Sequence, residues 1–184
     1  MKQQFGLLVT VGVGRCYGDM RDITTSYAEA QKALEYRMIL GSQTVISFED
    51  LSGSEHQDFY RILKMTDHII EALRQTEMEK IEQQVACLYQ DAIGHGLSPE
   101  LIRHFSYELV MKSLQAVAAT GVDVDEIMDN MGRIHTRIYR SRNWQELEQI
   151  VLDVLTQMAG KVEERRRQRG SNTLKAILAC GGNI

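Results

Sequence analysis

The sequence predicts an α+β fold that is mostly helical: a partial strand–helix–strand unit followed by an antiparallel helical bundle. Two short runs, residues 7–14 and residues 44–48, are rich in β-branched residues and have the length of strands. From residue 54 onward, apolar residues recur at helical spacing. The chain also has nine methionines and a single proline, Pro99, which is typical of a largely helical protein.

The first unit consists of a strand over 7–14, a helix over 26–40 that ends at Gly41, and a strand over 44–48. Alternating valines at positions 9, 11 and 13 predict that the first strand has a buried face. The predicted buried face of the helix consists of Tyr27, Ala30, Ala33, Leu34 and Met38. Because two strands under one helix cannot bury both faces of a sheet, we expect this unit to be truncated or completed by another part of the molecule.

Apolar stripes predict helices over 59–73, 78–89 and 98–117, the last with Ser98 as N-cap and Pro99 in its first turn. A short helix is expected over 123–131. A final helix should begin at Asn143, whose capping partner is Glu146, and continue to Met158. We divide the chain into an α/β unit (1–53), an antiparallel helical bundle (54–162) and a charged extension with a tail (163–184).

The composition excludes several classes of function. Of 184 residues, 43% are hydrophobic and 25% charged, as in soluble globular proteins, and the net charge of −4 gives no global case for nucleic-acid binding. Cys16, Cys87 and Cys180 form no metal or disulfide pattern, so reduced thiols are expected. The N-terminal sequence has neither a signal peptide nor a membrane span, and we predict a cytoplasmic location with no membrane contact.

The glycines at positions 12 and 14 raise the question of a phosphate-binding loop. A dinucleotide fingerprint needs a third glycine where this chain has Tyr17, and no Gly-Lys-Ser/Thr follows. We therefore interpret Gly12 and Gly14 as residues that ease the end of a strand.

Other isolated residues give no site. The five histidines form no HxxxH or HExxH pattern, and His95 is interpreted as a loop residue between two glycines. Asp123 and Asp125 lack the glycine and the terminal glutamate of a calcium loop, so they are assigned to a helix start. No catalytic, cofactor-binding or metal-binding residue is predicted.

The thiols and the arginine run are likewise given structural roles. Cys87 is assigned to the core of an apolar helix, whereas Cys16 is placed in a loop without a His or Asp partner. The run Arg165–Arg167 with Arg169 could contact phosphate. Glutamates precede it directly, however, so we interpret it as a solvated helix end.

Residues 11–51 carry a more specific pattern: a strand that ends Gly-hydrophobic-Gly-Arg, then Ser-Tyr-x-x-Ala, an Ala-Leu pair, a glycine and Val-x-x-Phe-Glu-Asp-Leu. This stretch resembles the C-terminal part of degenerate GGDEF-like domains of bacterial transcription regulators. These include AraC-type response regulators and the sugar-diacid and purine-catabolism regulators. The matching positions are Gly12, Gly14, Arg15, Tyr17, Asp19, Ser26, Tyr27, Ala30, Ala33, Leu34, Gly41, Val45, Phe48, Glu49, Asp50 and Leu51. The helical remainder resembles the linker of those regulators, with a Ser-Pro-Glu helix start at Ser98.

Departures from that family limit what the resemblance implies. Active diguanylate cyclases carry a Gly-Gly-Asp/Glu-Glu-Phe hairpin and metal-binding acids, which would stand before the first residue of this chain. The pair Arg37-Met38 stands where the family has Ala-Lys, so its phosphate-contacting lysine is absent. About 15 residues follow Arg169, too few for a helix-turn-helix unit. The chain therefore resembles the middle of a regulator.

The resemblance implies a non-enzymatic regulatory and signal-transmission segment of a two-component transcription regulator, without a cofactor. The expected partners are a second copy in a homodimer, an upstream receiver or sensor, and downstream DNA-binding domains, with no direct nucleic-acid contact by this segment. Two alternatives stay open: a module that senses a small nucleotide or metabolite and, least favoured, a diguanylate cyclase-type enzyme.

Overall fold

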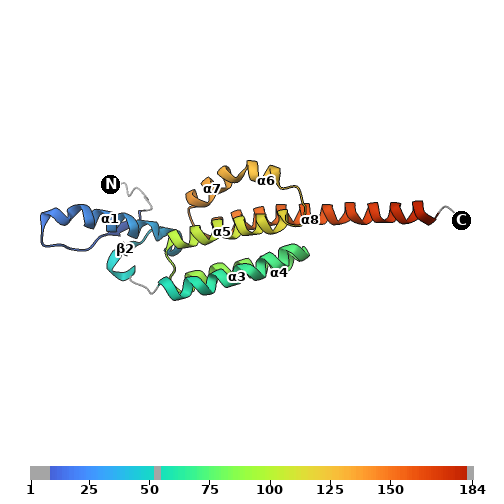
Figure 1. The fold of residues 1–184 in the computed structure, drawn as a ribbon. Coiled ribbons are helices and arrows are strands. Elements are labelled where there is room, and N and C mark those ends of the chain that lie inside the picture. Colours follow the sequence, from blue (N-terminus) through green and yellow to red (C-terminus); the bar gives the residue numbers. More distant parts are fainter. Residues whose placement is uncertain (1–8, 52–54, 182–184) are drawn as a thin grey trace, which may run out of the picture.

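The computed structural model describes the backbone of residues 9–51 and 55–181, and the side chains of these residues except 55–61, 63 and 171–181. It is mostly helical with a small parallel sheet, as predicted (Figure 1). The elements are β1 (Val11–Val13), a 3₁₀ turn (Met20–Asp22), α1 (Ile23–Glu35), α2 (Arg37–Leu40), β2 (Val45–Ser47), a second 3₁₀ turn (Phe48–Leu51), α3 (Glu55–Gln75), α4 (Met78–Gly94), α5 (Pro99–Ala118), α6 (Asp125–Asp129), α7 (Met131–Arg140) and α8 (Trp144–Gly181).

The two strands pair in parallel, with Val11 opposite Val45 and Gly12 opposite Ile46. Helix α1 covers the face that carries Gly12 and Ile46, and Ile46 is 3% exposed. The valines lie on the other face: Val11 and Val13 are 44% and 42% exposed, and Val45 is 69% exposed. The first strand therefore has a covered face, but Gly12 and not the alternating valines lies on it, because α1 covers the opposite face of the strand.

The glycines of β1 are required by the close approach of α1. A Cβ atom at Gly12 would lie 2.2 Å from the carbonyl oxygen of Ala30, and one at Gly14 would lie 1.9 Å from that of Ser26. No real Cβ tolerates such distances, so only glycine lets the helix backbone rest on the strand. We interpreted Gly12 and Gly14 as easing the end of a strand, and the structure shows that they allow α1 to contact β1 closely.

The helix predicted over 26–40 begins earlier, at Ile23, and is interrupted at Tyr36. Its predicted stop is confirmed, since Gly41 ends α2 with a φ of 86°. Tyr27 was assigned to the buried face but is 64% exposed, because α1 turns Ala33 and the carboxylate of Glu29 inward instead.

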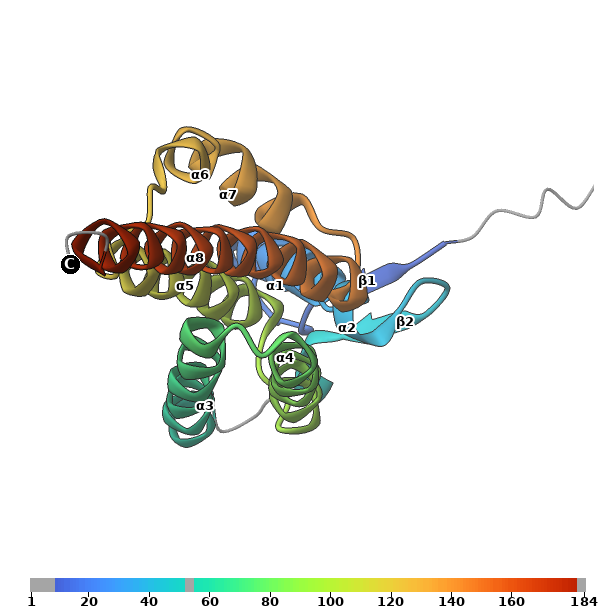
Figure 2. The ribbon, with the colours of Figure 1, turned by 90° about the vertical axis from the view of Figure 1, so that its right-hand side faces the viewer.

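Four helices, α3, α4, α5 and α8, enclose one hydrophobic core (Figures 1 and 2). The large side chains at its centre include Ile62, Leu73, Leu88, Tyr89, Phe105, Ile102 and Leu109. Helix α4 runs antiparallel to its neighbours, but α5 and α8 run in the same direction (Figure 1). The antiparallel prediction fails for that pair because α6 and α7 return the chain along the outside of the bundle.

Helix α7 was not predicted. Its sequence is nevertheless strongly amphipathic: Ile134 and Ile138 are buried, Met131 packs against the same core, and the arginines of the helix lie on its exposed side. Cys87 is a second correction: it is exposed, because the buried face of α4 is made by residues such as Val85, Leu88 and Tyr89, on the other side of the helix.

The predicted caps of α5 and α8 are confirmed. Ser98 Oγ accepts a hydrogen bond from the Leu101 N–H at 3.4 Å, and Asn143 Oδ1 accepts one from the Glu146 N–H at 2.7 Å. The Glu146 carboxylate accepts from the backbone N–H of Arg142 at 2.8 Å, so the reciprocal half of the capping box reaches one residue further back.

The α/β unit lies at the end of the bundle where α5 and α8 begin (Figure 1). Met38 of α2 is part of the bundle core, and Arg103 of α5 forms an ion pair with Glu35 of α1 at 3.7 Å. These contacts join the two parts of the chain.

Candidate functional site

The arginines near the end of the bundle fasten α8 to two other helices. Arg166 donates from Nη2 to the carbonyl oxygen of Arg74 at 2.6 Å and from Nη1 to that of Gln75 at 3.3 Å, at the C-terminus of α3. Arg169 donates from Nη2 to the carbonyl oxygen of Thr120, just beyond α5, at 3.3 Å. The last carbonyls of a helix have no partner within it and carry partial negative charge, so guanidinium groups stabilise both helix ends.

The arginine run is solvated, as predicted, but it does not lie at a helix end, because α8 continues to Gly181. Arg166 and Arg169 bind backbone carbonyls, and Arg165 lies over Gly121, where a Cβ atom would be 3.2 Å from its guanidinium. Arg167 makes no contact with another helix among the described residues, because its ion pair is with Glu163, one turn earlier on α8.

A further contact holds α6 against α8. Lys161 Nζ donates to the carboxylate of Glu126 at 2.9 Å, and this hydrogen bond raises the pKa of the lysine. Immediately beyond, residues 163–170 of α8 are all exposed. The helix then continues to Gly181, past the ends of α3 and α5 (Figure 1). The bundle therefore carries a helical arm whose base is fixed at three points.

The predicted boundary at residue 163 lies inside α8, which runs through it without a break. Helix α8 has 38 residues and, at about 1.5 Å per residue, is roughly 57 Å long, compared with roughly 30 Å for the 20 residues of α5.

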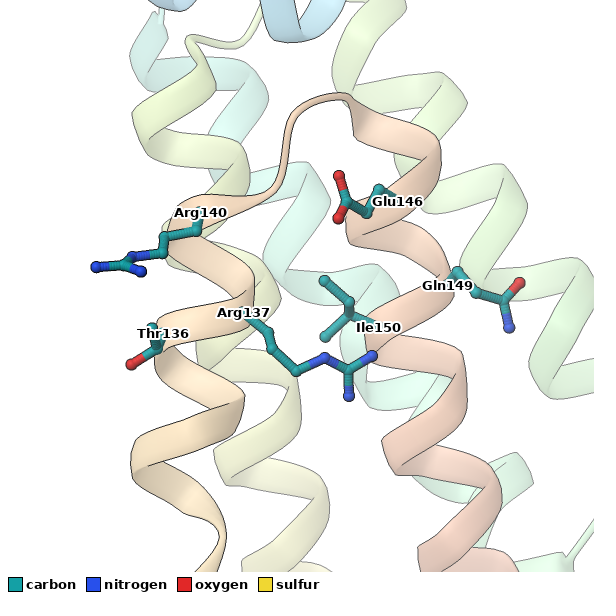
Figure 3. A pocket seen from close by; sticks show the side chains of 6 residues that line it. All are labelled: Thr136, Arg137, Arg140, Glu146, Gln149 and Ile150. Atoms are coloured by element: carbon teal, nitrogen blue, oxygen red, sulfur yellow. The ribbon is translucent and has the colours of Figure 1, made fainter.

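A shallow groove of about 370 Å³ lies between α7 and α8 (Figure 3). Arg137 reaches across it toward α8 and forms an ion pair with Asp153 at 3.4 Å, whereas Thr136 and Arg140 point away from it. Glu146, on the α8 side, already caps that helix. The groove therefore brings together no acid–base or nucleophile pair.

A second polar cluster lies at the turn after β1. The Glu29 carboxylate accepts from the Arg15 N–H at 2.9 Å and from the Tyr17 hydroxyl at 2.8 Å, and the Arg15 guanidinium stacks over the Phe48 ring. Desolvation raises the pKa of Glu29, but these hydrogen bonds and the charge of Arg15 outweigh it and lower the pKa overall. The hydrogen bond to Glu29 raises the pKa of Tyr17. These groups satisfy one another's hydrogen-bonding needs. The cluster, called the Glu29 clasp below, links the turn after β1 to α1.

The remaining sequence candidates also have local roles. Asp123 Oδ1 accepts from the Asp125 N–H at 3.0 Å at the start of α6, and His95, at the end of α4, lies 3.6 Å from the Asp91 carboxylate. Cys16 is exposed in the turn after β1, as predicted, whereas Cys180 lies outside the described side chains. Within the described part of the chain, no three His, Cys, Asp or Glu side chains gather as a metal site would need.

Comparison with known proteins finds a distant similarity. The chain is 18% identical over 173 residues to YtdP of Bacillus subtilis, which is described as an uncharacterized HTH-type transcriptional regulator. This alignment covers 94% of the chain and 22% of the relative, so the chain spans about a fifth of the regulator it matches. No family model and no solved structure matches the chain.

Among the described helices, none combines the length and the apolar character that crossing a lipid bilayer requires.

Proposed function

We propose that this chain is a non-catalytic regulatory segment of a bacterial transcription regulator of the two-component response-regulator type, which transmits a signal and dimerises in the cytoplasm. The similarity to an HTH-type regulator and the resemblance of residues 11–51 to degenerate GGDEF-like domains support the class. One observation supports the proposed transmission of a signal through α8: Arg166 and Arg169 fasten this helix to the ends of α3 and α5, directly before it leaves the bundle.

The mechanism is mechanical. An upstream receiver or sensor would change the position of the α/β unit, which contacts the bundle core through Met38. A close-packed bundle does not deform continuously, so the change would be passed to α8 as a rigid-body shift. In a homodimer, two such helices would set the spacing of DNA-binding domains elsewhere in the full-length protein, and this segment itself would not contact DNA.

Spin labels test the fastening directly. In a chain whose native cysteines are replaced by serine, labels at Gln83→Cys on α4 and Gly170→Cys on α8 should give a narrow distance distribution. The double variant Arg166→Gln/Arg169→Gln should broaden it, while the control Arg167→Gln should leave it narrow. An equally narrow distribution in the double variant would show that these arginines do not fix the arm.

The same variants test function in the full-length regulator. The double variant should weaken the signal-dependent change in reporter transcription at unchanged protein level and DNA affinity, and the Arg167→Gln control should respond normally. A normal response in the double variant would remove the proposed route through α8.

Two solution measurements address the other parts of the proposal. Light scattering should give the mass of a dimer, and a strict monomer at high concentration would contradict dimerisation. Incubation with GTP and Mg²⁺ should give no turnover above background, because catalysis would need metal-held acids and a cation on the phosphates. Measurable cyclic dinucleotide would overturn the non-catalytic assignment.

A further inference from the structure

A polar hollow of about 260 Å³ lies where the α/β unit meets the bundle. Four separate segments contribute its polar lining. These residues are Gln31 and Glu35 from α1, Arg37 from α2, Arg103 from α5, and Ser141 and Arg142 from the connection between α7 and α8. The hollow therefore touches both parts of the molecule and the start of α8.

The lining has an excess of positive charge. Three of the lining residues are arginines, Arg37, Arg103 and Arg142, and one, Glu35, carries a carboxylate. Glu35 is partnered with Arg103 at 3.7 Å, a long ion pair with the carboxylate side chain half exposed. Arg37 and Arg142 form no ion pair with any residue that the structure describes. Unneutralised cations around a hollow attract an anion.

Arg103 supplies the strongest observation. Its side chain is 15% exposed, and its Nε atom is buried without a hydrogen-bond partner among the described residues. A buried donor of a charged group that lacks an acceptor is costly, and such atoms are rare in native proteins. Because Nε itself is closed off from solvent, an anion in the hollow would bind the accessible part of the guanidinium group, for which a carboxylate or phosphate oxygen is the best-matched acceptor.

We propose that this hollow binds a small anion through a phosphate or carboxylate group, with Arg103 as the central ligand and Arg37 and Arg142 at its sides. The volume fits a small metabolite and is below the usual range for larger ligands. A bound anion would connect α2, α5 and the start of α8, and would thereby fix the α/β unit relative to the bundle. This binding goes beyond the proposed function and does not depend on dimerisation.

Calorimetric titration of the whole chain tests the proposal with two probes, inorganic phosphate and succinate, at constant ionic strength with chloride as the background anion. At least one probe should bind saturably at one site per chain, and the preferred probe identifies the anionic group. Arg37→Gln and Arg142→Gln should each weaken binding about tenfold, the loss expected for one charged hydrogen bond. Glu35→Gln should tighten binding, because it removes the competing carboxylate.

The matched control is Arg140→Gln, which removes one exposed arginine on α7 outside the hollow, and its affinity should equal that of the unmodified chain. Arg103→Gln should abolish binding; if that variant unfolds, the exposed residues Arg37 and Arg142 still decide the outcome. The proposal is overturned if neither probe binds with a Kd below about 10 mM, or if Arg140→Gln weakens binding as much as Arg142→Gln does. Loss of binding with an intact dimer would leave the proposed function standing.

Discussion

The helical bundle and the α/β unit are stabilised in different ways. The bundle buries large side chains such as Phe105, Tyr89 and Leu109 in one hydrophobic core. The α/β unit buries little beyond Ala33, Ile46 and Met38, and Met38 belongs to the bundle core. The unit instead depends on backbone contact at its glycines and on the Glu29 clasp. We therefore expect the bundle to depend less on the α/β unit than the unit, with its open sheet face, depends on the bundle.

Truncation of the bundle core should have the largest effect. Phe105 is fully buried, with its ring 5.5 Å from that of Tyr89, so Phe105→Ala should lower the free energy of unfolding by about 3–5 kcal/mol. Denaturant unfolding followed by circular dichroism measures this loss. Phe105→Leu keeps most of the volume and should cost less than about 1.5 kcal/mol. Equal losses would show that the core is not closely packed around the ring.

Gly14→Ala should break the α/β unit selectively. The new methyl group would overlap the Ser26 carbonyl, so α1 must move off β1, at a cost of about 1–3 kcal/mol. Hydrogen exchange should show lost protection in α1 and the strands and unchanged protection in α3–α5. Gly18→Ala is the control, because nothing lies within 4 Å of a Cβ atom there. Lost protection in the bundle as well would mean that the two parts unfold together.

Removal of the Arg166 cap should have an intermediate effect on the bundle. Arg166→Gln loses the charged hydrogen bonds to the end of α3 and should lower the free energy of unfolding, measured by chemical denaturation, by about 1 kcal/mol. The loss should be smaller at high salt, because salt screens the charge. Arg167→Gln loses one exposed pair with Glu163 and should cost about 0.3–0.5 kcal/mol. If the two variants lose equal stability, the Arg166 bonds do not anchor α8.

Acid should loosen the α/β unit before the bundle. Since the folded-state pKa of Glu29 lies below its ordinary 4.5, the clasp contributes its full stability above pH 4.5. This stability is lost as the pH falls through the lower folded value. The amide shift of Arg15, whose N–H binds Glu29, should report a titration midpoint below 4.5 by NMR. In Glu29→Gln this titration should vanish, whereas a midpoint above 4.5 would contradict the clasp.

The open face of the sheet should show the smallest effect. Val45→Thr changes a side chain that is 69% exposed and should alter the stability of the dilute chain by less than about 0.5 kcal/mol. Ile46, the next residue, lies on the covered face, and Ile46→Val should lower the free energy of unfolding by about 0.5–1.5 kcal/mol. Thermal unfolding at two protein concentrations compares them. A loss at Val45 that matches the one at Ile46 would show that the valine face is covered.

The sequence by itself determined the local structure. Regular apolar spacing predicted α3, α4 and α5, and the caps at Ser98 and Asn143 placed the starts of α5 and α8, because these signals act within a few residues. Helix α7 was missed although Met131, Ile134 and Ile138 have helical spacing, so its signal was present in the sequence and was overlooked. Cys87 and Tyr27 were placed on the wrong face because their helices turn other residues inward.

Only the tertiary structure decided which polar groups meet. The sequence suggested only that Gly12 and Gly14 ease the end of a strand, and the backbone of α1 shows why they must be glycine. Arg166 lies more than 90 residues from the carbonyls it binds, and Arg103 meets Arg37 and Arg142 only after three segments have packed together. The spacing of residues in the sequence cannot predict such contacts, because these charges come together through the packing of whole helices and not through local chain structure.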